Sequence, residues 1–251
     1  MSQAFWKLFL ASILFFLVPA GASAADIAGV NSTLSAQERA VDVTYFRAPG
    51  DGPRPSVLIL HGANGFDSQI ANYNRYASAL ANAGMDTYLV YYYSPADERR
   101  LTTDRNLFVS RFQSWTRLVS DLAADIRKRP DANGRIGLVG FSNGGTLSGG
   151  TAALDPAFSA AVIYYGAVPF PLKTPVTRLP PLLILHGDAD AIIPIEQGRR
   201  LADLAKSLKG KPELVVYPGE KHGFGSRIDG ENGADALART IAFLKRELDV
   251  R

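Results

Sequence analysis

Short apolar runs alternate along the chain with longer segments in which apolar residues recur every third or fourth position. The runs that predict strands are 56–60, 86–93, 136–139, 159–165, 182–185 and 213–217. Residues 40–47 alternate apolar and polar side chains, which predicts a half-exposed edge strand. Helical spacing covers 73–80, 106–129, 143–154, 196–208 and 237–248. Because strands and helices alternate about five times, we expect one α/β domain with a mostly parallel sheet covered by helices on both faces.

The segment Gly140-Phe141-Ser142-Asn143-Gly144 joins the strand predicted at 136–139 to the helix predicted at 143–154. A serine at the apex of a sharp strand-to-helix turn has an exposed hydroxyl. Glycines two residues away on either side permit the strained backbone and the close approach of helix to strand. The pattern predicts a nucleophile elbow with Ser142 as the nucleophile; the alternative is an ordinary glycine-rich turn.

A serine hydroxyl is a weak nucleophile at neutral pH and needs an adjacent base, and the chain has three histidines. His61 and His186 each end an apolar strand just before a glycine. His222 lies instead in a glycine-flanked loop, 218–225, between the last strand and the last helix. A loop at the carboxyl edge of the sheet can reach back over the elbow, so His222 is the predicted base; a structural loop histidine is the alternative.

The carboxylate that orients the base should leave another strand end, and the loop after His186 offers two candidates. Asp190 stands farther into the loop, where it can turn toward His222. Asp188 follows the tight turn directly and is expected to hydrogen-bond local backbone as an Asx-type turn residue. We favour Asp190 and leave Asp188 as the alternative. The order Ser142, Asp190, His222 is that of the α/β-hydrolase arrangement.

An oxyanion formed at Ser142 would need preorganised donors. The backbone N–H of Asn143 directly follows the nucleophile, at the positive end of the predicted helix. A second donor is expected from the loop after the strand 56–60, with Ala63 as the first choice and Leu60 or Asn64 as alternatives. We expect His61 to brace this loop rather than to take part in chemistry.

The sequence resembles the dienelactone hydrolase family of α/β hydrolases over roughly residues 40–249. The resemblance rests on the elbow 140–145, the strand end Tyr164-Tyr165-Gly166, the loop 186–194 and the loop 217–224. It implies the α/β-hydrolase fold and a cofactor-free ester or lactone hydrolase without a metal. It also supports Asp190, because the aspartate of the family stands four residues before a proline, here Pro194.

The chain departs from the family pattern at several positions. Archetypal members carry a cysteine nucleophile tuned by a glutamate, and here Ser142 and Ile59 stand near those places. Of the two arginines that hold the dienelactone carboxylate, the first falls at Pro95 and the second about one residue from Arg227. A general serine carboxylesterase is therefore the better interpretation, and Arg227 is a candidate substrate-binding residue.

The polar connection 94–105 carries three arginines and has two interpretations. It could form a lid or rim over the site, where Arg100 and its neighbours Arg99 and Arg105 would favour substrates that bear a carboxylate. The alternative is a solvated loop. The three tyrosines 91–93 that precede it are expected to pack on the strand rather than to contact substrate.

The first 24 residues have the composition of a secretory signal peptide. Lys7 precedes an apolar run of 11 residues, Leu8 to Val18, and Ala22-Ser23-Ala24 provides a cleavage site. The run is too short for a membrane span, so we expect cleavage after Ala24 and a periplasmic or secreted protein, with residues 25–251 forming a single domain. An uncleaved anchor is the alternative. The oligomeric state is left open.

Composition excludes several functional classes. The net charge is only +3 and the charges are interleaved, so no nucleic-acid partner is expected. The chain has no cysteine, no His-Glu-x-x-His motif and no P-loop lysine, which argues against thiolate metal sites, metallopeptidases and nucleotide enzymes. The alternatives to an esterase are a non-catalytic envelope-binding protein on the same fold and a serine peptidase.

Overall fold

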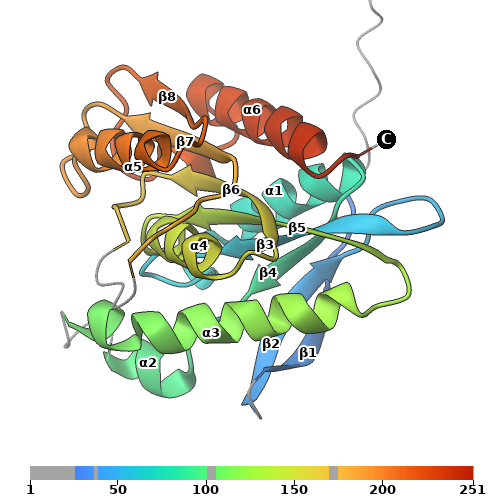
Figure 1. Ribbon diagram of the computed structural model, residues 1–251. Helices are drawn as coiled ribbons and strands as arrows, with labels where there is room; N and C mark the ends of the chain where they lie inside the picture. Colours follow the sequence, from blue (N-terminus) through green and yellow to red (C-terminus); the bar gives the residue numbers. More distant parts are fainter. Residues whose placement is uncertain (1–25, 37–38, 101–105, 170–174, 251) are drawn as a thin grey trace, which may run out of the picture.

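The computed structural model describes residues 26–36, 39–100, 106–169 and 175–250 as an eight-stranded sheet with helices on both faces (Figure 1). The spatial order of the strands is β1-β2-β4-β3-β5-β6-β7-β8. In chain order they are β1 Val30–Ala36, β2 Arg39–Phe46, β3 Arg54–Leu60, β4 Asp86–Val90, β5 Ala132–Phe141, β6 Phe158–Tyr164, β7 Leu182–Gly187 and β8 Glu213–Tyr217. Strands β1 and β2 are antiparallel to their neighbours, and the other six are parallel. The expected mostly parallel α/β sheet is confirmed.

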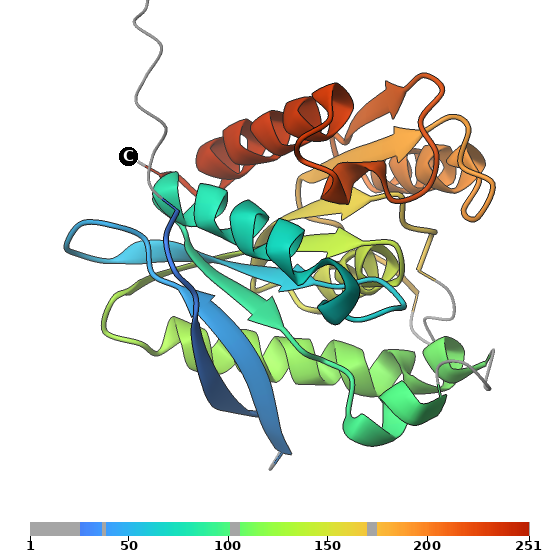
Figure 2. The ribbon, with the colours of Figure 1, turned by 180° about the vertical axis from the view of Figure 1, so that it is seen from behind.

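The helices divide between the two faces of the sheet as an α/β architecture requires. Helices α3 (Leu107–Arg127), α4 (Asn143–Leu154) and α5 (Ile195–Ser207) pack on one core. Helices α1 (Ile70–Asn82) and α6 (Glu231–Glu247) pack on the other, where Figure 2 shows them on one face of the sheet. Strands β3, β5 and β6 lie between the two cores, which explains their continuous apolar sequences.

The prediction that residues 40–47 form an edge strand is wrong. Strand β2 lies between β4 and β1, and β1 occupies the edge. The alternation in β2 arises because Val41 and Val43 are buried while Ala40 and Asp42 face solvent. A strand next to the edge can show this pattern as well as an edge strand can. Strand β1 was missed because most of its residues are exposed and polar, which leaves no periodic signal.

The polar connection after β4 contains a helix, α2 (Pro95–Arg100), that the sequence analysis did not predict. Ser94 and Asp97 form a capping box: the Asp97 N–H donates to Ser94 Oγ at 3.2 Å, and the Ser94 N–H donates to Asp97 Oδ2 at 3.0 Å. Arg111 and Trp115 of α3 also contact the Asp97 carboxylate, at 2.8 and 3.4 Å. The first residues of α2 therefore pack against α3 through Asp97.

Two predictions concern residues outside the described ranges. The signal peptide expected over 1–24 lies there, as do residues 101–105 of the proposed lid. In the described ranges, no helix is long and apolar enough to cross a membrane.

Candidate active site

The turn between β5 and α4 holds Ser142 in a strained conformation. Its φ of 56° and ψ of −116° lie outside the regions that non-glycine residues normally adopt, which matches the expected elbow. The Ser142 N–H donates to the Tyr164 carbonyl of the neighbouring strand at 3.0 Å. These constraints fix the serine at the carboxyl edge of the sheet, at the start of α4.

The glycines on either side of Ser142 are required by close backbone approach. A Cβ at Gly140 would lie 2.1 Å from the Gly144 carbonyl oxygen, and one at Gly144 would lie 2.2 Å from the Leu60 carbonyl oxygen. No side chain fits at such distances. The positive φ lies on Ser142 itself, so these two glycines serve the packing of α4 against β5 and β3.

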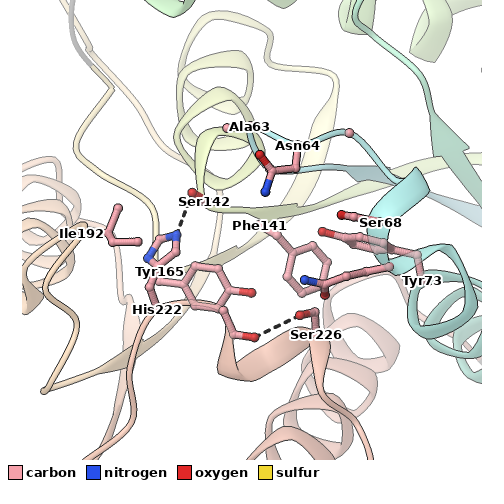
Figure 3. Close-up of a pocket in the computed structure, with 14 residues that line it drawn as sticks. Ala63, Asn64, Ser68, Tyr73, Phe141, Ser142, Tyr165, Ile192, His222 and Ser226 are labelled. Carbon is pink, nitrogen blue, oxygen red and sulfur yellow. Dashed lines mark hydrogen bonds between the residues drawn. The ribbon is translucent and has the colours of Figure 1, made fainter. Parts of the chain in front are cut away.

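Ser142, His222 and Asp190 form a continuous hydrogen-bonded series, although they come from three separate loops. The Ser142 Oγ lies 2.9 Å from His222 Nε2, a contact drawn in Figure 3. His222 Nδ1 lies 2.7 Å from Asp190 Oδ2. A carboxylate only accepts, so the Nδ1–H donates to Asp190, which leaves Nε2 of a neutral imidazole free to accept the serine proton. The arrangement can carry a proton away from Ser142.

Asp190 uses its second oxygen to shape its own loop. Oδ1 accepts the backbone N–H groups of Ile192 and Ile193, both at 2.9 Å, and the side chain is fully buried. The local turn role expected of Asp188 thus belongs to Asp190. Asp188 instead accepts the N–H of Gly219 at 2.6 Å, which ties its loop to the loop that carries His222. That prediction for Asp188 was wrong because the partner lies across the sheet edge and not in the local sequence.

The other two histidines are buried and hold loops. His61 stacks on Tyr92 with ring centroids 4.1 Å apart, and its Nδ1–H donates to the Gly62 carbonyl at 2.8 Å. Burial lowers the pKa of His61 to about 4. His186 donates from Nε2 to the Ile193 carbonyl at 2.8 Å, and burial lowers its pKa as well. Neither ring is linked to Ser142 by a hydrogen bond, and His61 contacts its own loop as expected of a brace.

The expected oxyanion donors lie on two segments next to Ser142, the start of α4 and the loop after β3. Asn143 is the first residue of α4, where backbone N–H groups point away from the helix. The loop after β3 passes beside the serine, since a Cβ at Gly62 would lie 3.4 Å from Ser142 Cβ. Ala63 and Asn64 of this loop line the cavity in front of Ser142 (Figure 3). Leu60 lies farther back, with its carbonyl oxygen against Gly144.

A cavity of about 270 Å³ opens in front of Ser142 and His222 (Figure 3). None of the described residues that line it is an arginine, lysine, aspartate or glutamate. They are Gly62, Ala63, Asn64, Gly65, Ser68, Gln69, Tyr73, Phe141, Ser142, Tyr165, Ile192, His222, Gly223 and Ser226. The described lining therefore combines apolar and polar side chains and contains no carboxylate, ammonium or guanidinium group.

Arg227, one of the two candidate substrate arginines, does not belong to this lining. Arg227 is exposed and pairs with Glu220 at 3.3 Å. Arg100 ends α2, and its side chain is outside the described part of the structure. Residues 95–98, the part of α2 whose side chains the structure describes, do not line the cavity. The tyrosines Tyr92 and Tyr93 are buried beside His61 and Trp115, in agreement with the packing role expected of them.

Tyr165 is a cavity residue whose position sequence reasoning did not anticipate. Its φ is 38°, its N–H donates to the Leu185 carbonyl at 2.8 Å, and its ring centroid lies 4.7 Å from that of His222. Burial raises the pKa of Tyr165 well above its ordinary value, so the hydroxyl stays protonated as a donor. The adjacent Gly166 was the available signal, because a tyrosine and glycine after a buried strand mark a sharp turn.

Among the described residues no group of three or more His, Cys, Asp or Glu side chains is arranged to hold a metal ion. The Ser142 hydroxyl, the His222 imidazole and the buried Asp190 carboxylate suit nucleophilic catalysis, since each group is within hydrogen-bond reach of the next.

Comparison with known proteins identifies similar sequences and folds. The model of the family described as "Dienelactone hydrolase family" matches residues 42–248. A protein from Methylorubrum extorquens named as a candidate carboxymethylenebutenolidase is 26% identical over 197 residues, which cover 72% of this chain and 67% of the relative. It and the two relatives ranked next to it are matched over 37 to 67% of their own lengths.

Two solved structures show the same fold. A dienelactone hydrolase from Anabaena variabilis has a TM-score of 0.72 and 20% identity, and the match covers 89% of this chain and 100% of that one. An esterase from Pyrobaculum calidifontis has a TM-score of 0.71 and 20% identity, with 87% of this chain and 84% of that one covered. At this identity the likeness concerns the fold, which is that of α/β hydrolases.

Proposed function

Because this chain belongs to the dienelactone hydrolase family, we propose that it hydrolyses carboxylic esters or lactones through an acyl-enzyme formed on Ser142. The observation that carries the proposal is the hydrogen-bonded series from Ser142 Oγ through His222 to Asp190, with contacts of 2.9 and 2.7 Å. A hydroxyl, its base and the carboxylate that orients the base are the three groups that acyl transfer by a serine requires.

In the proposed reaction, Ser142 Oγ attacks the ester carbonyl while its proton passes to His222 Nε2. Asp190 holds the imidazole through Nδ1–H and stabilises the cation that forms. The backbone N–H groups of Asn143 and Ala63 would donate hydrogen bonds to the negatively charged oxygen that forms from the carbonyl. His222 then donates its proton to the departing alcohol, and a water molecule repeats the sequence to release the acid. Each step uses groups of this chain and needs no cofactor.

The lining of the cavity supports small, uncharged substrates. An ester that bears a carboxylate would place that charge among lining residues of which none, in the described ranges, is an arginine or lysine that could pair with it. Ile59, near the place of the family glutamate, is fully buried in the core. These features separate the proposed activity from hydrolysis of an anionic dienelactone.

The direct test is hydrolysis of short-chain neutral esters by the wild type, by Ser142→Ala and by His222→Gln. We expect the wild type to be active and both variants to lose nearly all activity. Labelling with a serine-directed fluorophosphonate should modify the wild type and not Ser142→Ala. If the wild type neither hydrolyses esters nor reacts with the probe, a non-catalytic binding protein would be the better explanation. Cleavage of acyl-peptides by the wild type, lost in Ser142→Ala, would instead favour a serine peptidase.

We also propose that the protein acts outside the cytoplasm. The composition of residues 1–24 supports this, with an apolar run of 11 residues and an Ala-x-Ala site at 22–24. Mass spectrometry of the N-terminus after expression in a bacterium with an outer membrane provides the test. A periplasmic protein that begins at Ala25 is the expected result, and an intact N-terminus in the cytoplasmic fraction would refute the proposal.

A further inference from the structure

The proposed reaction divides the cavity into an alcohol side and an acyl side. His222 must donate its proton to the oxygen of the departing alcohol, so that alcohol has to lie next to Nε2. Figure 3 shows Ile192 and His222 on one side of Ser142, and Asn64, Ser68 and Tyr73 on the other. The alcohol portion of an ester therefore lies on the side of Ile192, and the acyl portion lies on the side of Asn64, Ser68 and Tyr73.

Ile192 is the most conspicuous apolar group on the alcohol side. It is 71% exposed, the largest exposure among the large apolar residues of the described ranges, and it lines the cavity. Single exposed apolar residues are common on protein surfaces and need no explanation by themselves. This one stands at the rim of a cavity that contains a paired serine and histidine, which gives it a substrate to contact.

The backbone that carries Ile192 is held from two sides. Asp190 Oδ1 accepts the N–H groups of Ile192 and Ile193, and the His186 ring donates to the Ile193 carbonyl. The carboxylate that orients His222 thus also positions Ile192. Because the side chain is presented on fixed backbone, a ligand that covers it need not order the loop first.

We propose that Ile192 determines specificity for the alcohol portion of the ester and favours apolar alkyl or aryl alcohols. The inference rests on the proposed function. An apolar alcohol that covers Ile192 removes apolar surface of both partners from water, whereas methanol is too small to reach it. The contact exists during acylation and is lost when the alcohol departs, so it affects the formation of the acyl-enzyme and not its hydrolysis.

The test measures kcat/KM for methyl, butyl and benzyl acetate, which share one acyl group. For Ile192→Ala we expect the butyl-to-methyl ratio to fall roughly 5- to 20-fold, at the low end of what a methylene contact contributes in an enclosed pocket, because Ile192 stands at an exposed rim. Ile192→Leu keeps an apolar side chain of similar volume and should retain most of the ratio. Val109→Ala is the matched control, because Val109 is 50% exposed on α3 and does not line the cavity.

A second series, methyl acetate against methyl butanoate, varies the acyl group instead. Its ratio should be the same in the wild type and Ile192→Ala. If Ile192→Ala changes the acyl ratio and leaves the alcohol ratio intact, the assignment of the two sides is reversed and the inference is overturned. An unchanged alcohol ratio also overturns it, while Ser142→Ala still abolishes turnover. If the wild type hydrolyses no ester, or Ser142→Ala remains active, the proposed function fails and the inference fails with it.

Discussion

The packing of α4 against β3 yields a quantitative prediction for Gly144→Ala. The added Cβ would lie 2.2 Å from the Leu60 carbonyl oxygen and 2.5 Å from the His61 carbonyl oxygen. Ordinary contact begins at 3.4 Å, so the backbones must separate by about 1.2 Å. The atoms that obstruct the methyl group are main-chain atoms at the end of a central strand and cannot rotate away.

The separation would act on the site because α4 starts at Asn143, directly after Ser142. A displacement of about 1 Å in a catalytic group can cost roughly 100-fold in rate. We therefore expect kcat/KM of Gly144→Ala for a neutral ester to fall about 100-fold or more. Overpacking typically costs about 1–3 kcal/mol, and the helical preference of alanine over glycine offsets up to about 1 kcal/mol of that. A net destabilisation of about 1–2 kcal/mol should be visible in urea unfolding.

Gly149→Ala in the same helix is the matched control. Its Cβ would first meet Ile163 Cδ1 at 3.3 Å, the end of a flexible side chain. The substitution gains helix propensity of about 0.5–1 kcal/mol and leaves the elbow in place, so activity should stay near that of the wild type. If Gly144→Ala keeps kcat/KM within about threefold of the wild type and unfolds at the same urea concentration, the close approach is not what holds the site.

Three further predictions concern the carboxylates and the buried histidine. Asp190→Asn should lower kcat/KM by about 10³–10⁴, because an amide does not stabilise the His222 tautomer that carries its proton on Nδ1. The side-chain oxygen in Asp188→Asn can still accept from the Gly219 N–H, so this variant should lose far less activity, and equal losses would refute the assignment of Asp190. The pKa of His61 is lowered from 6.5 to about 4, so the unfolded chain binds the proton first as the pH falls, and the free energy of unfolding should drop by about 3 kcal/mol from pH 6.5 to 4. In His61→Gln, the free energy of unfolding from urea titrations should depend less steeply on pH over that range. Asp86→Ala removes the partner that lies 3.1 Å from the buried Arg54 guanidinium and should destabilise the protein by about 3–5 kcal/mol. Asp203→Ala breaks an exposed pair with Lys206 and should cost less than about 1 kcal/mol, so similar losses in the two variants would contradict this reasoning.

The parts of the fold that could be predicted from sequence are those whose apolar pattern is generated by burial. Strands β3, β5 and β6 could be predicted from their continuous apolar runs, because helices cover both of their faces. Strand β1 contributes almost no buried side chain, so burial left no pattern in it. Helix α2 is set by a capping box and by the contact of Asp97 with Arg111. The capping box can be seen in the sequence Ser94-Pro95-Ala96-Asp97, but α2 has only six residues, which are too few to show helical periodicity.

The candidate site divides in a similar way. Ser142, Asp190 and His222 could be chosen because each follows a strand end, and the topology of a parallel sheet brings strand ends to one edge. The cavity walls could not be chosen in this way. Ser68 and Gln69 belong to the short helix η1 (Asp67–Gln69), Tyr73 belongs to α1, and Ser226 belongs to the short helix η2 (Phe224–Ser226). Their side-chain directions depend on how those elements dock, which local sequence does not encode.

The repeated segment Leu-Ile-Leu-His-Gly, at 58–62 and 183–187, links the fold to the chemistry. Each copy ends a strand with a buried histidine that donates to a carbonyl of the following loop, at Gly62 and at Ile193. The first of these loops carries Ala63, and the second carries Asp190 and Ile192. Burial lowers the pKa of both histidines, so neither gains charge near neutral pH and the loops keep their hydrogen bonds there. The two loops that carry Ala63, Asp190 and Ile192 should therefore keep their arrangement when the pH is varied around neutrality.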